Sequence, residues 1–414
     1  MKKTTWLAAT IGALVAVPTS TMADDAFFEA LTGGKVSFSE RVRYEGVDQN
    51  NALKDADAIT ARTTLGYETG VFHGFRAFAE FEDVTRLGSS DYNSKTNGET
   101  DYSVIADPSG TEVNQAYLGY TNFDTDFRLG RQEITYRKAP FHRFVGNVLW
   151  RQNHQSFDAL SLSNDSLENT KISYAYIDKV NTIFGEDFDN EPVIKDGQIG
   201  MNTHLVNVQY TGLPFGKLEG YGYLLDYDDK GSLSNQTYGG RFSGAQPVNE
   251  DWKIIYPAEY ADQSDYKDGA MDSQNYYLAE LGGKYKGWLA KASYEMQEGD
   301  GVYSFKTPLG TNHAFQGWAD MFLSTPKEGL KDMYFTVVGN ILGTKVIGVY
   351  HDFETDKGSL DAGSEFDILV QKTFMKHYTL GVKYADYSAD SEYTAVNAKS
   401  VDTDKFWLYG QIKF

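Results

Sequence analysis

The nine residues Phe406-Trp-Leu-Tyr-Gly-Gln-Ile-Lys-Phe414, at the carboxyl end of the chain, alternate between two kinds of position. Counted back from Phe414, Ile412, Gly410, Leu408 and Phe406 fall on one face, opposite Lys413, Gln411, Tyr409, Trp407 and Lys405. Successive side chains of a β-strand point to opposite faces, so this period of two predicts a strand with one apolar and one polar side. Both a membrane β-barrel and a soluble β-sandwich can end on such a strand. The sequence at the amino end is therefore needed to distinguish these two architectures.

The amino end has the parts of a secretory signal peptide. Lys2 and Lys3 are basic, and an apolar stretch follows over residues 6–17. Thr21-Met-Ala23 then places small residues at the −3 and −1 positions of a cleavage site. The apolar stretch is shorter than the roughly 20 residues that a membrane-spanning helix needs, and a retained buried helix is the alternative. We expect a signal peptide at residues 1–23 and one barrel domain at residues 24–414, because a secreted chain ending on such a strand is typical of the Gram-negative outer membrane.

Composition excludes several other classes of protein. The chain has no Cys, which excludes disulfide frameworks and thiolate metal sites. The net charge of −20 argues against a nucleic-acid partner, because phosphate binding needs a basic surface. The counts of 29 Tyr, 25 Phe and 40 Gly beside only 9 Pro suit β-structure. A mean hydropathy of −0.47 excludes a bundle of membrane-spanning helices but permits a barrel, in which only alternate residues face lipid.

Alternation of this kind recurs in eighteen segments, which we predict to be strands. Most of them are close to the 9–11 residues that a tilted strand needs to cross the hydrocarbon layer. The predicted strands are residues 35–46, 58–69, 74–86, 112–121, 126–135, 157–163, 170–180, 203–211, 217–227, 237–244, 252–262, 274–285, 288–298, 331–339, 343–353, 364–374, 377–387 and 403–414.

The connections between these segments alternate in length. Odd-numbered connections such as 87–111 and 299–330 are long, and even-numbered ones such as 122–125 and 286–287 are short. Short periplasmic turns and long external loops are expected of a membrane barrel, whereas a soluble sandwich or propeller has no reason for this asymmetry. We therefore predict an all-β fold, a transmembrane antiparallel β-barrel of 18 strands. Outer-membrane lipid and lipopolysaccharide would surround it, and Phe414 would be its contact for the barrel-assembly machinery.

Arginine is concentrated early in the chain, with ten of the eleven arginines between Arg41 and Arg151. Guanidinium groups that point into a pore bind carboxylates and lower the barrier to an anion. The alternation directs inward Arg41, Arg43, Arg62, Arg76, Arg128 and Arg241, together with Lys171, Lys253, Lys291, Lys383 and Lys405. Arg131 conflicts with the apolar face of its strand, and a bulge or a place near the membrane rim would resolve that conflict.

Acidic residues also point inward by the same alternation. They are Glu45, Glu68, Glu80, Glu82, Glu259, Glu280, Glu295 and Asp367. Each inward arginine therefore has two interpretations, since it either pairs with an acid to hold the barrel in shape or contributes to a substrate path. The sequence leaves this choice open for single residues, and we predict that some members of the group form a path for anions.

Two long connections differ from the others in composition. Residues 136–152 are basic and aromatic, and we predict that they fold into the mouth as a constriction. Residues 309–318 carry aromatic rings that could stack on sugar faces. Ordinary loop packing is the alternative for both. The candidate mouth residues are Arg137, Lys138, Arg143 and Trp318.

The excess negative charge lies mainly in the predicted external loops, for example in Asp226-Tyr-Asp-Asp229 and Asp187-Phe-Asp-Asn-Glu191. Carboxylates in such runs could bind Ca²⁺ and bridge to lipopolysaccharide. Their loose spacing favours solvated loop charge instead. We therefore expect neither a dedicated metal site nor a cofactor.

A series of short motifs runs in order along most of the chain after residue 23. The motifs are Leu65-Gly-Tyr-Glu-Thr-Gly70, Gly74-Phe-Arg-Ala-Phe-Ala-Glu80, Leu129-Gly-Arg-Gln132, Trp150-Arg-Gln-Asn-His-Gln-Ser-Phe-Asp158, Tyr174-Ala-Tyr-Ile-Asp-Lys-Val180, Phe184-Gly-Glu-Asp187, Asn235-Gln-Thr-Tyr-Gly-Gly-Arg241 and Asn312-His-Ala-Phe-Gln-Gly-Trp-Ala-Asp320. Together they resemble the alginate-export-type outer-membrane porins.

This resemblance implies an eighteen-stranded monomeric barrel, in agreement with the independent strand count. In the namesake of the family, a positively charged lumen conducts an anionic uronate polymer, and loops occlude the two mouths. Carried onto this chain, the pore-lining role falls on Arg41, Arg43, Arg62, Arg76, Arg128, Arg131, Arg151 and Arg241. The resemblance thus implies a porin for anionic solutes such as uronate oligomers or alginate. A general porin, or one for the uptake of another solute, is the alternative.

The rival class is an outer-membrane hydrolase, which needs a constellation such as Ser-His or Asp-His within hydrogen-bonding reach. Seven His are scattered along the chain, and none lies in a His-Glu-x-x-His or Gly-x-Ser-x-Gly pattern. We therefore predict that the protein is not an enzyme. A receptor or adhesin whose external loops bind a partner is a third interpretation.

Overall fold

Eighteen antiparallel strands close into a barrel in the computed structural model, which describes residues 21–140, 142–186, 188 and 197–414. Strands that follow each other in the chain pair throughout, and β1 (Lys35–Gln49) pairs with both β2 (Ala56–Glu68) and β18 (Thr403–Lys413). This last pairing leaves the sheet without a free edge, so its backbone polar groups are satisfied without water. The predicted all-β barrel of 18 antiparallel strands is confirmed.

The other strands are β3 (Phe75–Arg86), β4 (Gly110–Asn122), β5 (Thr125–Gln132), β6 (Ser156–Asn164), β7 (Thr170–Asn181), β8 (Gln198–Leu213), β9 (Gly216–Leu225), β10 (Asn235–Pro247), β11 (Trp252–Asp265), β12 (Gln274–Tyr285), β13 (Trp288–Gln297), β14 (Leu330–Ile341), β15 (Thr344–Glu354), β16 (Asp361–Phe374) and β17 (Tyr378–Ser388). Each of the eighteen predicted segments overlaps one of the eighteen observed strands. The largest difference is at β8, which begins at Gln198 because residues 198–200 continue the pairing beyond a bulge between Ile177 and Lys179.

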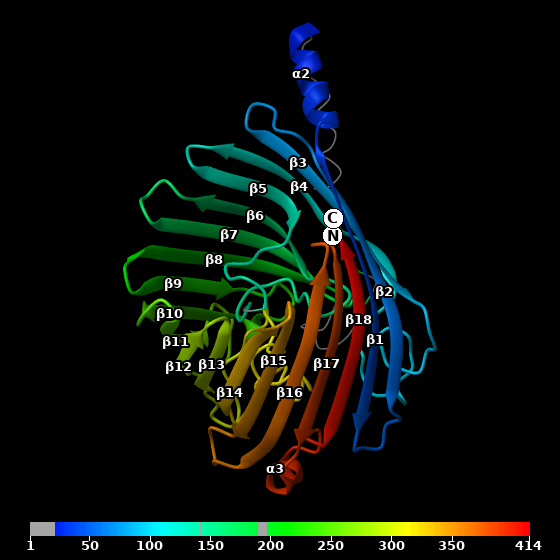
Figure 1. Ribbon diagram of the computed structural model, residues 1–414, viewed down its shortest axis with the longest axis vertical. Helices are drawn as coiled ribbons and strands as arrows, with labels where there is room; N and C mark the ends of the chain where they lie inside the picture. Colours follow the sequence, from blue (N-terminus) through cyan, green and yellow to red (C-terminus); the bar gives the residue numbers. More distant parts are fainter. Residues whose placement is uncertain (1–20, 141, 187, 189–196) are drawn as a thin grey trace.

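Short helices lie at both ends of the barrel. Helix α2 (Thr21–Thr32) precedes β1 at the end that carries the carboxyl terminus, and α3 (Ser391–Val396) lies at the opposite end (Figure 1). A 3₁₀ turn, η3 (Gly231–Leu233), interrupts the connection from β9 to β10. Within the described residues, no helix is long and apolar enough to cross a membrane. Of the predicted signal peptide, only the last three residues are described, as the start of α2, and its cleavage remains a prediction.

The alternation sorts side chains into a lipid-facing set and a lumen-facing set. On β18, Phe406 and Leu408 are 39% and 51% exposed, whereas Lys405 and Trp407 beside them are 7% and 3% exposed. The exposed face of β18 is thus apolar while its charged lysine lies inside, which is the reverse of a soluble protein and suits a barrel in lipid.

Two long connections fold back into the barrel interior (Figure 1). The first inner loop, residues 133–155, joins β5 to β6, and the second inner loop, residues 298–329, joins β13 to β14. Phe141 of the first loop is outside the described residues. Both loops bond to inward-facing side chains: Arg41 of β1 donates to the Leu149 carbonyl, and Glu365 of β16 accepts from the Ala319 N–H. Residues 136–140 and 142–152 therefore lie inside the barrel, and their role as a constriction at the mouth remains a prediction.

The two faces of β18 predict opposite responses to the same substitution. Leu408→Arg places a charge against lipid in the middle of the strand, and we expect it to lower the free energy of unfolding by about 2–4 kcal/mol. Gln411→Arg adds the same group on the lumen side, and we expect a change within about 0.5 kcal/mol. Denaturant titration of the folded barrel in lipid measures both, and equal losses would contradict the assigned faces.

Candidate functional site

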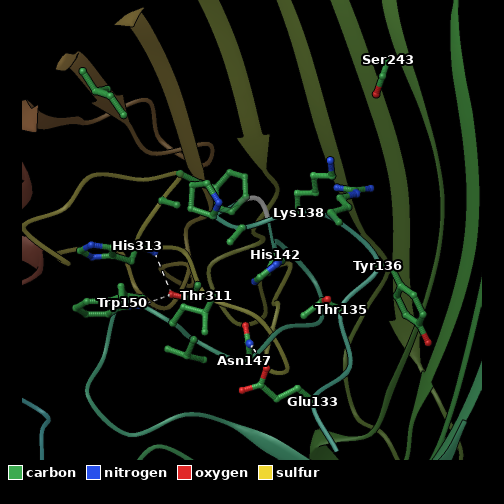
Figure 2. Close-up of a pocket in the computed structure, with 18 of the residues that line it drawn as sticks. Glu133, Thr135, Tyr136, Lys138, His142, Asn147, Trp150, Ser243, Thr311 and His313 are labelled. Carbon is green, nitrogen blue, oxygen red and sulfur yellow. Dashed lines mark hydrogen bonds between the residues drawn. The ribbon is translucent and has the colours of Figure 1, made fainter. Parts of the chain in front are cut away.

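A cavity of about 1380 Å³ lies in the lumen between the barrel wall and the two inner loops. Its wall residues come from strands around most of the barrel, from Arg41 on β1 to Gln411 on β18. Lys138 and Trp150 of the first inner loop and His313 of the second complete the lining. Figure 2 shows the rings of Trp150 and His313 side by side, where the two loops meet.

The described part of the cavity lining carries twelve Lys and Arg side chains but only four Asp and Glu side chains. The cations are Arg41, Arg43, Arg128, Arg137, Lys138, Lys171, Lys217, Arg241, Lys284, Lys291, Lys345 and Lys383, and the acids are Asp126, Glu133, Glu219 and Glu280. The chain as a whole has a net charge of −20, so the lining of this cavity has the opposite sign to the chain. A low-dielectric cavity with excess positive charge concentrates anions.

Half of the lining cations have no carboxylate within ion-pair distance among the described residues. They are Arg41, Lys138, Lys217, Lys284, Lys345 and Lys383. The remaining six are paired, and two of these pairs share an acid: Arg137 and Arg241 each bond Glu259 at 2.6 Å. Glu219 bonds Arg137 at 3.1 Å and supplies a second carboxylate there, so the positive charge of the lining comes mainly from the six cations without an acid partner in the described part of the chain.

The predicted site residues divide into two groups by position. Those that line the cavity are Arg41, Arg43, Arg128, Arg137, Lys138, Arg241 and Trp318. Those outside the lining are Arg62, Arg76, Arg131, Arg143 and Arg151.

Three arginines outside the lining bridge neighbouring strands or loops. Arg62 lies 3.9 Å from Glu82 and contacts His154. Arg76 bonds Asp126 at 2.6 Å and Glu68 at 3.1 Å. Arg131 bonds Asp158 at 2.8 Å and contacts Glu186, at the long-loop end of β5. Arg131 thus has acid partners at the long-loop end of its strand, and its place near the membrane rim remains a prediction.

The first inner loop is fixed to β1 by buried charges. Arg151 of the loop bonds Glu45 of β1 at 2.7 Å. Asp107, which belongs to the connection between β3 and β4, accepts the Gln152 N–H at 2.9 Å and contacts Arg43. Burial alone would raise the pKa of Asp107, but the guanidinium groups of Arg151 and Arg43 hold that pKa below its ordinary value. Asp107 therefore stays ionised as an anchor for the loop.

Arg143 joins the two inner loops to each other. Its guanidinium group is fully buried and donates to Asn312 at 2.9 Å and to Gln316 at 2.6 Å. It also contacts the buried carboxylate of Glu295 on β13. The loops share backbone bonds as well, since the Gly146 N–H donates to the Leu309 carbonyl at 2.9 Å. Arg143 thus holds the loops together instead of facing the cavity.

The second inner loop is fixed to β17 and β18 by a chain of charged contacts. Lys405 bonds Asp320 at 2.8 Å, Asp320 bonds His313 Nδ1 at 2.5 Å, and His313 Nε2 lies 2.5 Å from Lys383 Nζ. The Lys383 ammonium also lies 4.0 Å from the centre of the Trp318 ring. Burial and the nearby Lys383 lower the pKa of His313 to about 3, so the imidazole is neutral near pH 7.

Three of the lysines that line the cavity were not predicted from the sequence to point inward: Lys217, Lys284 and Lys345. The alternation of side chains along the strands could have identified two of them as inward-facing. Lys217 lies on the same face of its strand as the inward Glu219, and Lys284 on the same face as the inward Glu280. No cluster of three metal-ligating side chains occurs among the residues that the structure describes. Asp226 of the first suggested Ca²⁺ loop pairs with Lys267, whereas most of the second, residues 187–191, is outside the described residues.

A closed barrel with an apolar outer face and a charged lumen defines a channel of the Gram-negative outer membrane. The sequence profile of the alginate export family matches residues 35–286, and the chain belongs to this family. The resemblance given by the short motifs is therefore confirmed. No curated protein matches the chain in sequence.

Solved structures of outer-membrane porins share the fold. OccAB4 of Acinetobacter baumannii superimposes with a TM-score of 0.72 at 15% identity, over 92% of this chain and 98% of that one. OpdL of Pseudomonas aeruginosa gives 0.68 at 15% identity, over 93% and 99%. OccK9 (OpdG) of the same organism gives 0.70 at 13% identity, over 93% and 100%. Because the family and these neighbours are channels, the protein is a channel and not an enzyme.

The contact of Arg143 with Glu295 predicts a defect in the docking of the inner loops. Arg143→Met leaves the Glu295 carboxylate buried without a cation, which costs about 3–5 kcal/mol. We expect the variant to show larger and noisier single-channel conductance and faster proteolysis of the inner loops. The double variant Arg143→Met/Glu295→Gln removes the unpaired charge and should recover part of the loss. Wild-type behaviour of the single variant would contradict this role.

The depressed pKa of His313 predicts how docking of the second inner loop depends on pH. The undocked histidine binds a proton near its ordinary pKa of about 6.5, whereas the docked one does so only near pH 3. The docked state therefore loses stability as pH falls from about 6.5 toward 3. We expect conductance to become noisier over this range, and less so in His313→Gln. A conductance independent of pH between 6.5 and 4 would exclude the effect.

Proposed function

We propose that the protein is a passive channel that carries anionic solutes, with uronate oligomers or an acidic polysaccharide such as alginate as its substrates. The observation that carries this proposal is the excess of Lys and Arg over Asp and Glu on the cavity wall, within a chain of strongly negative net charge. The match to the alginate export family supports a uronate substrate.

The substrate path runs along the cations that line the cavity. On the barrel wall these include four of the arginines expected from the sequence, Arg41, Arg43, Arg128 and Arg241. Arg137, Lys138 and Trp318 of the inner loops narrow the path from the other side. Solvated ion pairs are worth about 0.2–1 kcal/mol each. Contacts of this strength, repeated along a pore, bind a carboxylate while still letting it leave.

A second candidate substrate is a small carboxylate. One of the porins with the same fold, OpdK of Pseudomonas aeruginosa, was solved with vanillate, at a TM-score of 0.70 and 12% identity. Vanillate joins an aromatic ring to a carboxylate, and in the cavity wall here the indole ring of Trp318 lies 4.0 Å from the Lys383 ammonium. Block by uronate oligomers, compared with block by single carboxylates, separates the two candidates.

We also propose which molecules the barrel contacts in the outer membrane and during its export. Lipopolysaccharide would contact the long-loop end, and the barrel-assembly machinery would recognise the strand that ends in Phe414. Signal peptidase would cleave after Ala23, within the sequence that forms α2. Mass determination of the protein from outer membranes tests the cleavage site.

Removing lining charge should lower anion preference. Arg128 shares Asp126 with Arg76, which keeps that acid paired when Arg128 is lost, and Lys138 has no acid partner among the described residues. We expect Arg128→Gln/Lys138→Gln to reduce the chloride-to-potassium permeability ratio several-fold, as measured from reversal potentials in planar bilayers.

The matched control is Arg86→Gln, which removes an exposed charge at the long-loop end of β3, outside the cavity lining. It should leave the permeability ratio unchanged. If the double variant behaves like this control, the lining cations do not set selectivity.

A further inference from the structure

Five lysines share one level at the short-turn end of the barrel. Each is the second residue from that end of its strand. They are Lys171 on β7, Lys217 on β9, Lys253 on β11, Lys284 on β12 and Lys345 on β15, and we call them the lysine ring. Four of them line the cavity, and Lys253 shares an inward face with Ile255, which also lines it.

The lysine ring lacks neutralising partners. Lys253 and Lys284 lie directly opposite each other in the register of β11 and β12, an arrangement of like charges that costs stability. Within the described chain, only Lys171 has an acid within ion-pair distance, and its 3.7 Å contact with Asp165 joins two solvated side chains. Lys217 bonds a neutral group, Gln209, at 2.5 Å. The ring therefore presents charge that an external anion would neutralise.

The opposite end of the barrel has the opposite charge. Outside the two inner loops, the long connections contain nineteen Asp and Glu but only seven Lys and Arg. An anion that approaches from this side meets repulsion, whereas one that approaches from the short-turn side meets the lysine ring. Fields of this kind change association rates by factors of about 10–10³ at low ionic strength.

We propose that the lysine ring is a capture site for linear polyanions and that it loads the channel from the short-turn, periplasmic side. This inference rests on the proposed function and adds the place and side of substrate capture. A single carboxylate gains about 0.2–1 kcal/mol from one solvated lysine. A chain of carboxylates engages several lysines at once, so its residence time rises with its length.

The test records block of single channels by uronate oligomers added to one side of a planar bilayer. Orientation is assigned with Ser232→Cys, an exposed position at the long-loop end, because the chain has no other Cys for a membrane-impermeant thiol reagent. Trimers and hexamers of uronate are compared with a neutral glucan of equal length, at low and high salt.

We expect the hexamer to block at least 10-fold faster from the short-turn side than from the long-loop side at low salt. This asymmetry should shrink at high salt, and the trimer should leave sooner than the hexamer. Lys253→Gln/Lys284→Gln/Lys345→Gln should abolish most of the asymmetry. Lys267→Gln/Lys327→Gln/Lys357→Gln removes equal charge at the long-loop end and should preserve it. If the first triple variant fails to fold, Lys284→Gln alone should give a smaller decrease in the same direction.

Equal block from both sides of an anion-selective channel would overturn the capture site and leave the proposed function intact. An asymmetry that survives the loss of the three lysines would also overturn it. Cation selectivity of the wild-type channel would instead defeat the proposed function itself.

Discussion

No backbone N–H or C=O group of a membrane-spanning strand can face lipid without a hydrogen-bond partner, and this constraint shapes the whole barrel. Pairing of β1 with β18 meets this constraint by closing the sheet. Closure then gives each strand one lipid face and one lumen face, which is why the charged residues of the strands gather inside. The charge of the lumen is therefore a property of alternate residues, and it can differ in sign from the charge of the whole chain.

A barrel of this width needs more than its wall to make a selective path. The two inner loops fill part of the lumen, and buried charges hold them there: Arg151 with Glu45, Arg143 with Glu295, and Asp320 with Lys405. Buried pairs of this kind contribute little net stability, but losing one partner is costly, so they fix position more than they add free energy. The charges of these residues are neutralised where the loops dock. Fewer cations therefore face the cavity than point inward from the barrel wall and the loops.

The sequence predicted the barrel because the constraint leaves a local signal, the alternation that ends in Phe406 to Phe414. The alternation of long and short connections predicted which end of the barrel faces the periplasm, because membrane barrels have short periplasmic turns and long external loops. The partners of single arginines could not be predicted, because they come from residues far apart in the chain. Arg143 meets Glu295 across 152 positions, and no periodicity records this contact. The roles of the predicted pore arginines therefore depended on how the loops dock.

The zero-current potential of the wild-type channel in a potassium chloride gradient shows whether the cavity cations set the selectivity of the pore. A lumen whose cavity carries three times as many cations as acids should pass chloride in preference to potassium, and the potential should take the sign set by chloride. A potential of the sign set by potassium would exclude control by the cavity cations, because the acidic loops and not the cavity wall would then control permeation.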